Sequence, residues 1–199
     1  MSQTEVRPSV YENRDELHKA QRIIIKIGSA VLTREDQSGL AFARLASIVE
    51  QVSDLRNAGK DVIIVTSGAV ALGKQKINTE IKLSQSMRQT IRQLTTESTS
   101  NSQSTIPSVR FAASIGQRIL IDLYGIMFTQ YGVTITQVLV TKSDFHNQIR
   151  RTNLRYTIEE CFGQSVVPIV NTNDAIVSPM MPDDPDIIIE PETGPKEVT

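Results

Sequence analysis

The chain has 199 residues, with 21 Lys and Arg against 22 Asp and Glu, and its formal net charge is −1. This length suits one domain with a substantial core, and the near-neutral charge gives no field that would recruit nucleic acid. A single cysteine excludes an internal disulfide framework. No apolar run reaches the roughly 20 residues of a membrane span, and no secretory or transit signal is visible at the N-terminus. We therefore expect a cytoplasmic protein without a membrane span.

The first apolar segment, RIIIKIGSAVL at 22–32, organises the rest of the chain. Its three consecutive isoleucines predict a buried strand that has Lys26 near its carboxyl end. Burying an ammonium is unfavourable unless an anion offsets it, so we expect Lys26 to point out of the sheet toward a negative group. Gly28 permits close backbone approach, and Gly28 and Ser29 can supply N–H donors. A phosphate site is one interpretation, and a lysine that simply reaches water is the other.

Residues 40–58 carry apolar side chains at helical spacing, and the continuous apolar run DVIIVT follows at 61–66. Strand, helix and apolar strand in this order predict a parallel pair buried on both faces. A helix is expected to begin directly afterwards, with Ser67 as its N-cap and with Gly68 allowing a ligand near the backbone. Ordinary capping is the alternative for Ser67, but Lys26 at the neighbouring strand end favours an anion site.

The middle of the chain alternates helices with polar segments. A polar amphipathic helix is predicted at 82–94, followed by a low-complexity, flexible insert at 95–107. In the long helix predicted at 109–131, Gly116 beside Gln117 indicates close approach of another backbone or of a ligand. A third strand at 133–141, a loop containing Asp144, and a helix at 150–162 with Cys161 on its packed side complete this part.

A fourth strand, predicted at 165–170, ends in the polar cluster Asn171-Thr172-Asn173-Asp174. Amides and a carboxylate at the carboxyl end of a strand suit an amine or amide ligand, although the same residue types also form plain turns. With Lys26 for an anion and Asp174 for a cation, the sequence predicts a site for a zwitterion. Residues 1–20 are interpreted as a polar arm, and residues 179–199 as a disordered tail rich in proline and acidic residues.

Four segments, IKIGSAVLT at 25–33, IVTSGAVALGKQK at 64–76, AASIGQ at 112–117 and VVPIVNTNDAIV at 166–177, resemble the amino-acid kinase family. Within it they are most similar to glutamate 5-kinases and to the kinase part of animal delta-1-pyrroline-5-carboxylate synthases, over residues 21–178. The resemblance implies an α/β fold, a three-layer αβα sandwich with a mainly parallel sheet. It also implies transfer of the γ-phosphoryl group of ATP, with Mg²⁺, to the side-chain carboxylate of glutamate, the first step toward proline or ornithine.

The resemblance further implies roles for particular residues. Lys26 is the implied catalytic residue, because its charge would stabilise the transferred phosphoryl group. The implied phosphate-binding residues are Lys26, Gly28, Ser29 and Gly68. The implied glutamate-binding residues are Ser67, Ala69, Asn171 and Asp174, with possible support from Gly116, Gln117 and Asn173. No side chain is expected to ligate a metal ion.

The segments that contact the nucleotide in this family have no counterpart among these residues, nor has the NADPH-dependent reductase of the bifunctional enzymes. We therefore expect a partial kinase domain truncated in its C-terminal nucleotide-binding half. Two alternatives stay open: a glutamate 5-kinase with impaired activity, or an inactive short isoform that binds glutamate or assembles as a regulatory partner with full-length synthase. A homo-oligomer is expected, and a mitochondrial location, as in the animal relatives, is the alternative to the cytoplasm.

Overall fold

The computed structural model describes residues 14–34, 39–94 and 108–176. The predicted flexible insert and acidic tail, and most of the predicted N-terminal arm, lie outside these ranges. The described part of the arm is a 3-10 helix, η1 (Arg14–Lys19), that leads into the first strand. The predicted domain of 21–178 is therefore described almost throughout.

A four-stranded sheet in the order β1-β2-β4-β3 forms the centre of the molecule. Its strands are β1 (Arg22–Ile27), β2 (Asp61–Thr66), β3 (Ile135–Val140) and β4 (Val167–Thr172). Each neighbouring pair is parallel. All four strands therefore end at the same edge of the sheet, which we call the carboxyl edge. The mainly parallel α/β class predicted from the sequence is confirmed.

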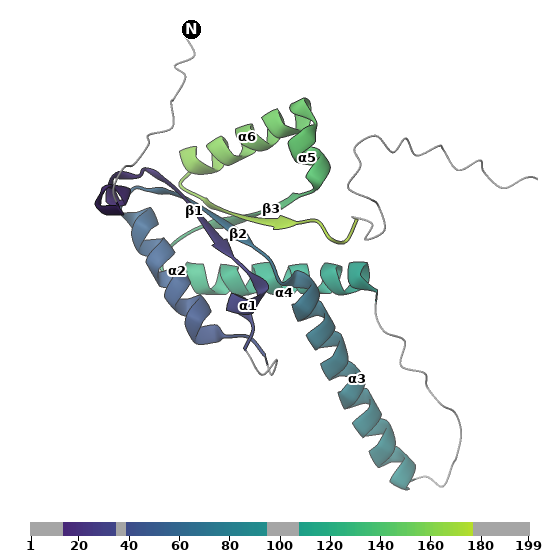
Figure 1. The fold of residues 1–199 in the computed structure, drawn as a ribbon. Coiled ribbons are helices and arrows are strands. Elements are labelled where there is room, and N and C mark those ends of the chain that lie inside the picture. Colours follow the sequence, from purple (N-terminus) through teal and green to yellow (C-terminus); the bar gives the residue numbers. More distant parts are fainter. Residues whose placement is uncertain (1–13, 35–38, 95–107, 177–199) are drawn as a thin grey trace, which may run out of the picture.

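Helices cover the sheet on two sides, which gives the three predicted layers (Figure 1). One side carries α1 (Ser29–Leu32), α2 (Phe42–Asn57) and α4 (Val109–Thr129). The opposite side carries α5 (Lys142–His146) and α6 (Gln148–Gly163). The remaining helix, α3 (Ala69–Leu94), begins at the carboxyl edge and extends away from the body of the molecule. It runs continuously through 82–94, where a separate helix was predicted.

The hydrophobic core lies between the sheet and the layer of α2 and α4. Branched side chains of β2 and β4 meet leucine, valine and aromatic side chains of the two helices. Its fully buried members include Val62, Ile64, Val167, Ile169, Leu45, Val49, Leu120, Tyr124 and Phe128. Burial of apolar area on this scale is the main stabilising contribution to such a domain.

The opposite face of the sheet is less well covered. Ile24 is 68% exposed there, and the burial of β1 alternates along its length. The prediction that both strands of the first pair are buried on two faces is therefore wrong for β1. The reason is its position, because β1 is the edge strand and α5 and α6 leave its outer side chains open.

Two local features also differ from the prediction. The segment around Asp144 is the short helix α5 rather than a loop, because the Thr141 and Asp144 side chains cap its first turn reciprocally. The short helix α1 was not predicted.

By length and composition, α4 is the described helix that could cross a membrane. One such helix is weak support for a span, and here its buried side chains form part of the core. The prediction of a packed Cys161 is confirmed, since it is 9% exposed.

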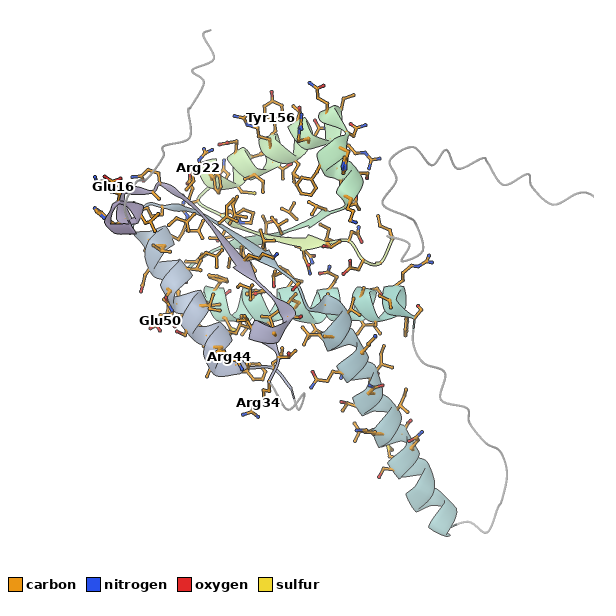
Figure 2. All side chains as sticks on the ribbon, viewed as in Figure 1. Glu16, Arg22, Arg34, Arg44, Glu50 and Tyr156 are labelled. Atoms are coloured by element: carbon orange, nitrogen blue, oxygen red, sulfur yellow. The ribbon has the colours of Figure 1, made fainter. Side chains whose placement is uncertain are left out.

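Arg22 ties the amino-terminal ends of the strands to α6. Its guanidinium donates two hydrogen bonds to the Glu159 carboxylate, at 2.7 and 2.6 Å. It also lies 3.4 Å from Asp61 and 5.1 Å from the centroid of the Phe162 ring. Figure 2 shows Arg22 beside α6, at the end of the sheet away from the carboxyl edge. This ion-paired cluster is therefore distant from the strand ends considered next.

Candidate functional site

The ends of β1 and β2 are joined directly at the carboxyl edge. The Ser67 N–H donates to the Ile27 carbonyl at 3.1 Å, and the Ser67 hydroxyl lies 3.4 Å from the same oxygen. This bond places the Ser67-Gly68 loop beside the Lys26–Gly28 segment, as predicted. Ser67 is not the N-cap, because its hydroxyl is donated to β1 and the helix begins only at Ala69.

Gly68 is required by its local geometry. Its φ is +103°, and an added Cβ would lie 3.1 Å from Cδ1 of Leu32. A residue with a side chain would therefore be strained and would press on α1. The glycine keeps the β2 loop close against the segment that follows β1.

Gly28 differs from Gly68 both in its backbone conformation and in the space around an added Cβ. Its φ of −76° is open to any residue, and an added Cβ would meet no atom within 4 Å. Neither backbone conformation nor internal packing accounts for a glycine here. The missing side chain leaves open space beside Lys26, which is exposed and has no hydrogen-bond or ion-pair partner among the described residues. An unpaired ammonium beside open backbone suits a phosphate or another anion.

Asp174 follows β4 at the same carboxyl edge. It is half-buried, and it has no hydrogen-bond or ion-pair partner in the part of the chain that the structure describes. Burial raises the pKa of its carboxyl group, because a desolvated carboxylate is unfavourable without a counter-charge. An ammonium group would supply that charge. Asp174 therefore suits the cationic end of a ligand, and Lys26 suits the anionic end.

Asn171, also predicted to bind substrate, lies within β4, which ends two residues later than expected. It is 4% exposed, and both ends of its amide are used inside the protein. Nδ2 donates to Oε1 of Gln117 at 3.2 Å, and Oδ1 accepts the Thr172 N–H at 2.8 Å. Glutamate binding by Asn171 stays a prediction, while Asn173 and Asp174 are the members of the cluster at the open edge.

Ala69 and Gly116 are packed against each other. Ala69 is 1% exposed, and a Cβ on Gly116 would lie 1.7 Å from the Ala69 carbonyl oxygen. The prediction that Gly116 marks close approach is thus confirmed, and the approaching group is the backbone of α3. Among the remaining predicted residues, Ser29 is exposed on the first turn of α1, and Gln117 is 7% exposed in contact with Asn171.

Three polar residues behind the carboxyl edge, Thr66, Tyr124 and Gln137, were not predicted from the sequence. The hydroxyls of Tyr124 and Thr66 lie 3.1 Å apart in the core, where burial raises the pKa of Tyr124. Gln137 of β3 donates to Oε1 of Gln117 at 3.2 Å. One signal was available, since Gln117 and Tyr124 lie about two turns apart on the packed face of one helix.

The described residues contain no group of three His, Cys, Asp or Glu side chains that could hold a metal ion. Mg²⁺ that accompanies a nucleotide is held largely by phosphate oxygens and water. We therefore assign no metal ligand among the described residues.

In the part of the chain that the structure describes, a lysine and a carboxylate without partners lie with an open glycine at one edge of a parallel sheet. Such an αβα protein belongs to the class that binds small charged ligands at the carboxyl ends of its strands. The chain is a member of the amino acid kinase family, whose model matches residues 21–180.

Individual relatives agree with this membership. Over 167 residues the chain is 34% identical to a glutamate 5-kinase from Marinomonas sp. (strain MWYL1), covering 84% of this chain and 39% of that protein. It is 37% identical over 170 residues to delta-1-pyrroline-5-carboxylate synthase 1 from Oryza sativa subsp. japonica, covering 84% and 22%. A glutamate 5-kinase from Clostridium tetani (strain Massachusetts / E88) is 32% identical over 167 residues, covering 84% and 55%. The chain thus spans 22% to 55% of the length of these relatives.

A solved UMP kinase from Ureaplasma parvum is similar with a TM-score of 0.43 and 17% identity, over 76% of this chain and 55% of that one.

Proposed function

We propose that this chain binds glutamate at the carboxyl edge of its sheet and takes part in transfer of the γ-phosphoryl group of ATP to the glutamate side chain. The observation that carries the proposal is a pair of charges without a partner among the described residues, exposed Lys26 near the end of β1 and half-buried Asp174 after β4. The names of the relatives, glutamate 5-kinase and delta-1-pyrroline-5-carboxylate synthase, support the same substrate and favour phosphorylation over glutamate binding alone.

Each of the two charged residues contacts a different reactant. Asp174 accepts hydrogen bonds from the α-ammonium of glutamate, which relieves its desolvated carboxylate. Lys26 faces the phosphoryl group in transfer, and the open space at Gly28 lets that group approach the backbone. The loop of Ser67 and Gly68 lies between the two strand ends that carry these residues, because β2 separates β1 from β4.

The proposed reaction needs no protein nucleophile. An oxygen of the glutamate γ-carboxylate attacks the γ-phosphorus of ATP, and the bond from that phosphorus to the bridging β,γ-oxygen breaks. The electron pair leaves with ADP, and the product is γ-glutamyl phosphate. Catalysis then depends on positioning and on offsetting the charge of the transferring group, the role proposed for Lys26.

A trapping assay tests the proposal. Hydroxylamine converts an acyl phosphate to a hydroxamate, so the full chain is incubated with glutamate, ATP, Mg²⁺ and hydroxylamine. We expect glutamate-dependent hydroxamate from the unchanged chain and a loss of about 100-fold or more in Lys26→Ala. Lys76→Ala is the control, because it removes an exposed lysine that pairs with Glu80 on α3. A folded chain that forms no hydroxamate, or a Lys26→Ala variant at the full rate, contradicts the proposal.

Assembly into a homo-oligomer and a cytoplasmic location stay predictions from the sequence. NADPH has no proposed role in this chain.

A further inference from the structure

The side-chain amide of Gln117 connects α4 to the end of β4, next to the proposed ammonium-binding residue. We infer that Gln117 is a positioning residue, which orients the Asn173-Asp174 segment by fixing the peptide group between Thr172 and Asn173. The effect of Gln117 on glutamate binding rests on the proposed function. Whether Gln117 holds this peptide group in place can be measured in the ligand-free chain.

The peptide group between Thr172 and Asn173 is held from two sides. Its carbonyl oxygen, on Thr172, accepts a hydrogen bond from Nε2 of Gln117 at 2.8 Å. Its N–H, on Asn173, donates to the Val140 carbonyl of β3 at 2.8 Å. The plane of this peptide sets the direction in which the chain leaves β4. Asp174 is the next residue, so its direction depends on the same two bonds.

The orientation of the Gln117 amide is itself determined. Its Oε1 accepts from Nδ2 of Asn171 and from Nε2 of Gln137, each at 3.2 Å. A flipped amide would place its NH₂ group against two donors and its oxygen against the Thr172 carbonyl. Gln117 is 7% exposed, so water cannot replace lost partners. One orientation of the amide is therefore strongly preferred.

The backbone that carries Gln117 is also fixed. Its neighbour Gly116 lies against the carbonyl oxygen of Ala69, at the first residue of α3. Ala69 directly follows the Ser67-Gly68 loop. A single turn of α4 therefore contacts the start of the helix after β2 and the end of β4, and it sets the two loops relative to each other.

Hydrogen exchange of the Asn173 N–H tests the inference in the ligand-free chain. In Gln117→Leu, which keeps the size but removes the amide, we expect this proton to exchange about tenfold faster or more. The control is Arg22→Met, which removes the ion-paired cluster at the opposite end of the sheet. Both variants are compared at equal stability, set with denaturant. An Asn173 exchange rate that rises no more in Gln117→Leu than in Arg22→Met overturns the inference.

Glutamate binding gives the second readout. We expect the Kd for glutamate to rise about tenfold in Gln117→Leu and to stay unchanged in Arg22→Met, as measured by calorimetry. Equal weakening in both variants shows a merely structural effect and overturns the positioning role. If the unchanged chain binds no glutamate, the proposed function is contradicted instead. The exchange measurement then tests by itself whether Gln117 positions the peptide group.

A milder variant covers the case in which Gln117→Leu does not fold. Gln137 is exposed on β3, and its side-chain amide donates to Oε1 of Gln117 at 3.2 Å. Gln137→Ala therefore loosens the amide at low risk to folding. We expect a two- to threefold rise in the exchange rate of the Asn173 N–H. An unchanged rate overturns the inference.

Discussion

The backbone of Gly116 lies directly against the backbone of Ala69. A Cβ on Gly116 would be 1.7 Å from the Ala69 carbonyl oxygen, and a Cβ on Gly73 would be 1.7 Å from the Ala112 carbonyl oxygen. Helices α3 and α4 thus cross without side chains between them. This crossing anchors the helix that follows the β2 loop, so packing between two helices reaches the candidate site.

Gly116→Ala tests the importance of this crossing. The added methyl group overlaps backbone atoms, which cannot rotate away as a side chain can, so α3 and α4 must separate. We expect a loss of about 3 kcal/mol in the free energy of unfolding, measured by urea denaturation. Gly125→Ala on the same helix is the control. Its Cβ would meet no atom within 4 Å, and we expect a gain of about 0.5 to 1 kcal/mol. Similar effects at the two positions would show that the helices are not in backbone contact.

Gly28→Ala separates function from stability. The position has an ordinary φ of −76° and open space around an added Cβ, so the fold tolerates alanine. We expect the free energy of unfolding to stay unchanged or to rise by up to about 1 kcal/mol. Hydroxamate formation should fall at least about tenfold, because the methyl group occupies the space proposed for the phosphoryl group.

The matched variant for Gly28→Ala is Gly68→Ala, at a φ of +103°. Here the left-handed backbone is unfavourable for alanine, so we expect a loss of about 1 to 2 kcal/mol in stability. Full phosphoryl transfer in Gly28→Ala would exclude a ligand from that space.

Asp174→Asn is expected to weaken glutamate binding and yet stabilise the ligand-free chain. Burial raises the pKa of the Asp174 carboxyl group in the folded state. The folded chain then binds more protons than the unfolded chain just above the ordinary pKa of about 4, so this group lowers stability as pH rises through that range. The asparagine lacks this penalty. We expect a higher Tm than the unchanged chain at pH 7 and no difference near pH 3.

The same variant should bind glutamate about 10- to 100-fold more weakly at pH 7, because a charge-assisted hydrogen bond to the ammonium is lost. Calorimetry at constant ionic strength measures this. If Asp174→Asn bound glutamate as tightly as the unchanged chain, Asp174 would not be part of the proposed site.

Asp144 should affect stability in the opposite direction. The Thr141 hydroxyl and N–H, together with Arg150, lower the pKa of the Asp144 carboxyl group. The stabilising contribution is therefore complete above the ordinary pKa of about 4 and is lost as pH falls through the lower folded value. We expect Tm to fall less steeply below pH 4 in Asp144→Asn than in the unchanged chain. Parallel pH profiles would show that this cap of α5 does not contribute to acid sensitivity.

Much of the sheet followed from short apolar runs. The four strands, their parallel class and the meeting of Lys26 with the Ser67-Gly68 loop were predicted, because continuous apolar segments separated by helices leave few other topologies. The mid-helix glycine also gave a correct prediction of a close backbone approach, at Gly116.

The remaining features depend on tertiary contacts. The apolar run of β1 does not reveal that it is an edge strand, since that depends on β3 and β4 both joining the sheet on the β2 side. The polar cluster after position 170 gives no sign that Asn171 is inside the strand, because the Gln117 amide that satisfies it comes from a helix far away in sequence. Separating the inward amide of Asn171 from the outward carboxylate of Asp174 required the structure.

Mapping by NMR tests whether the ends of β1, β2 and β4 form one glutamate site. The ¹⁵N-labelled full chain is titrated with glutamate, with glutamine as the matched ligand that lacks the acceptor carboxylate. We expect both ligands to shift the backbone amide signals of Gly28, Ser67, Gly68, Asn173 and Asp174. The shifts at Gly28, Ser67 and Gly68 should be larger with glutamate than with glutamine. Shifts confined to other surfaces, or none at saturating glutamate in the folded chain, would contradict this expectation.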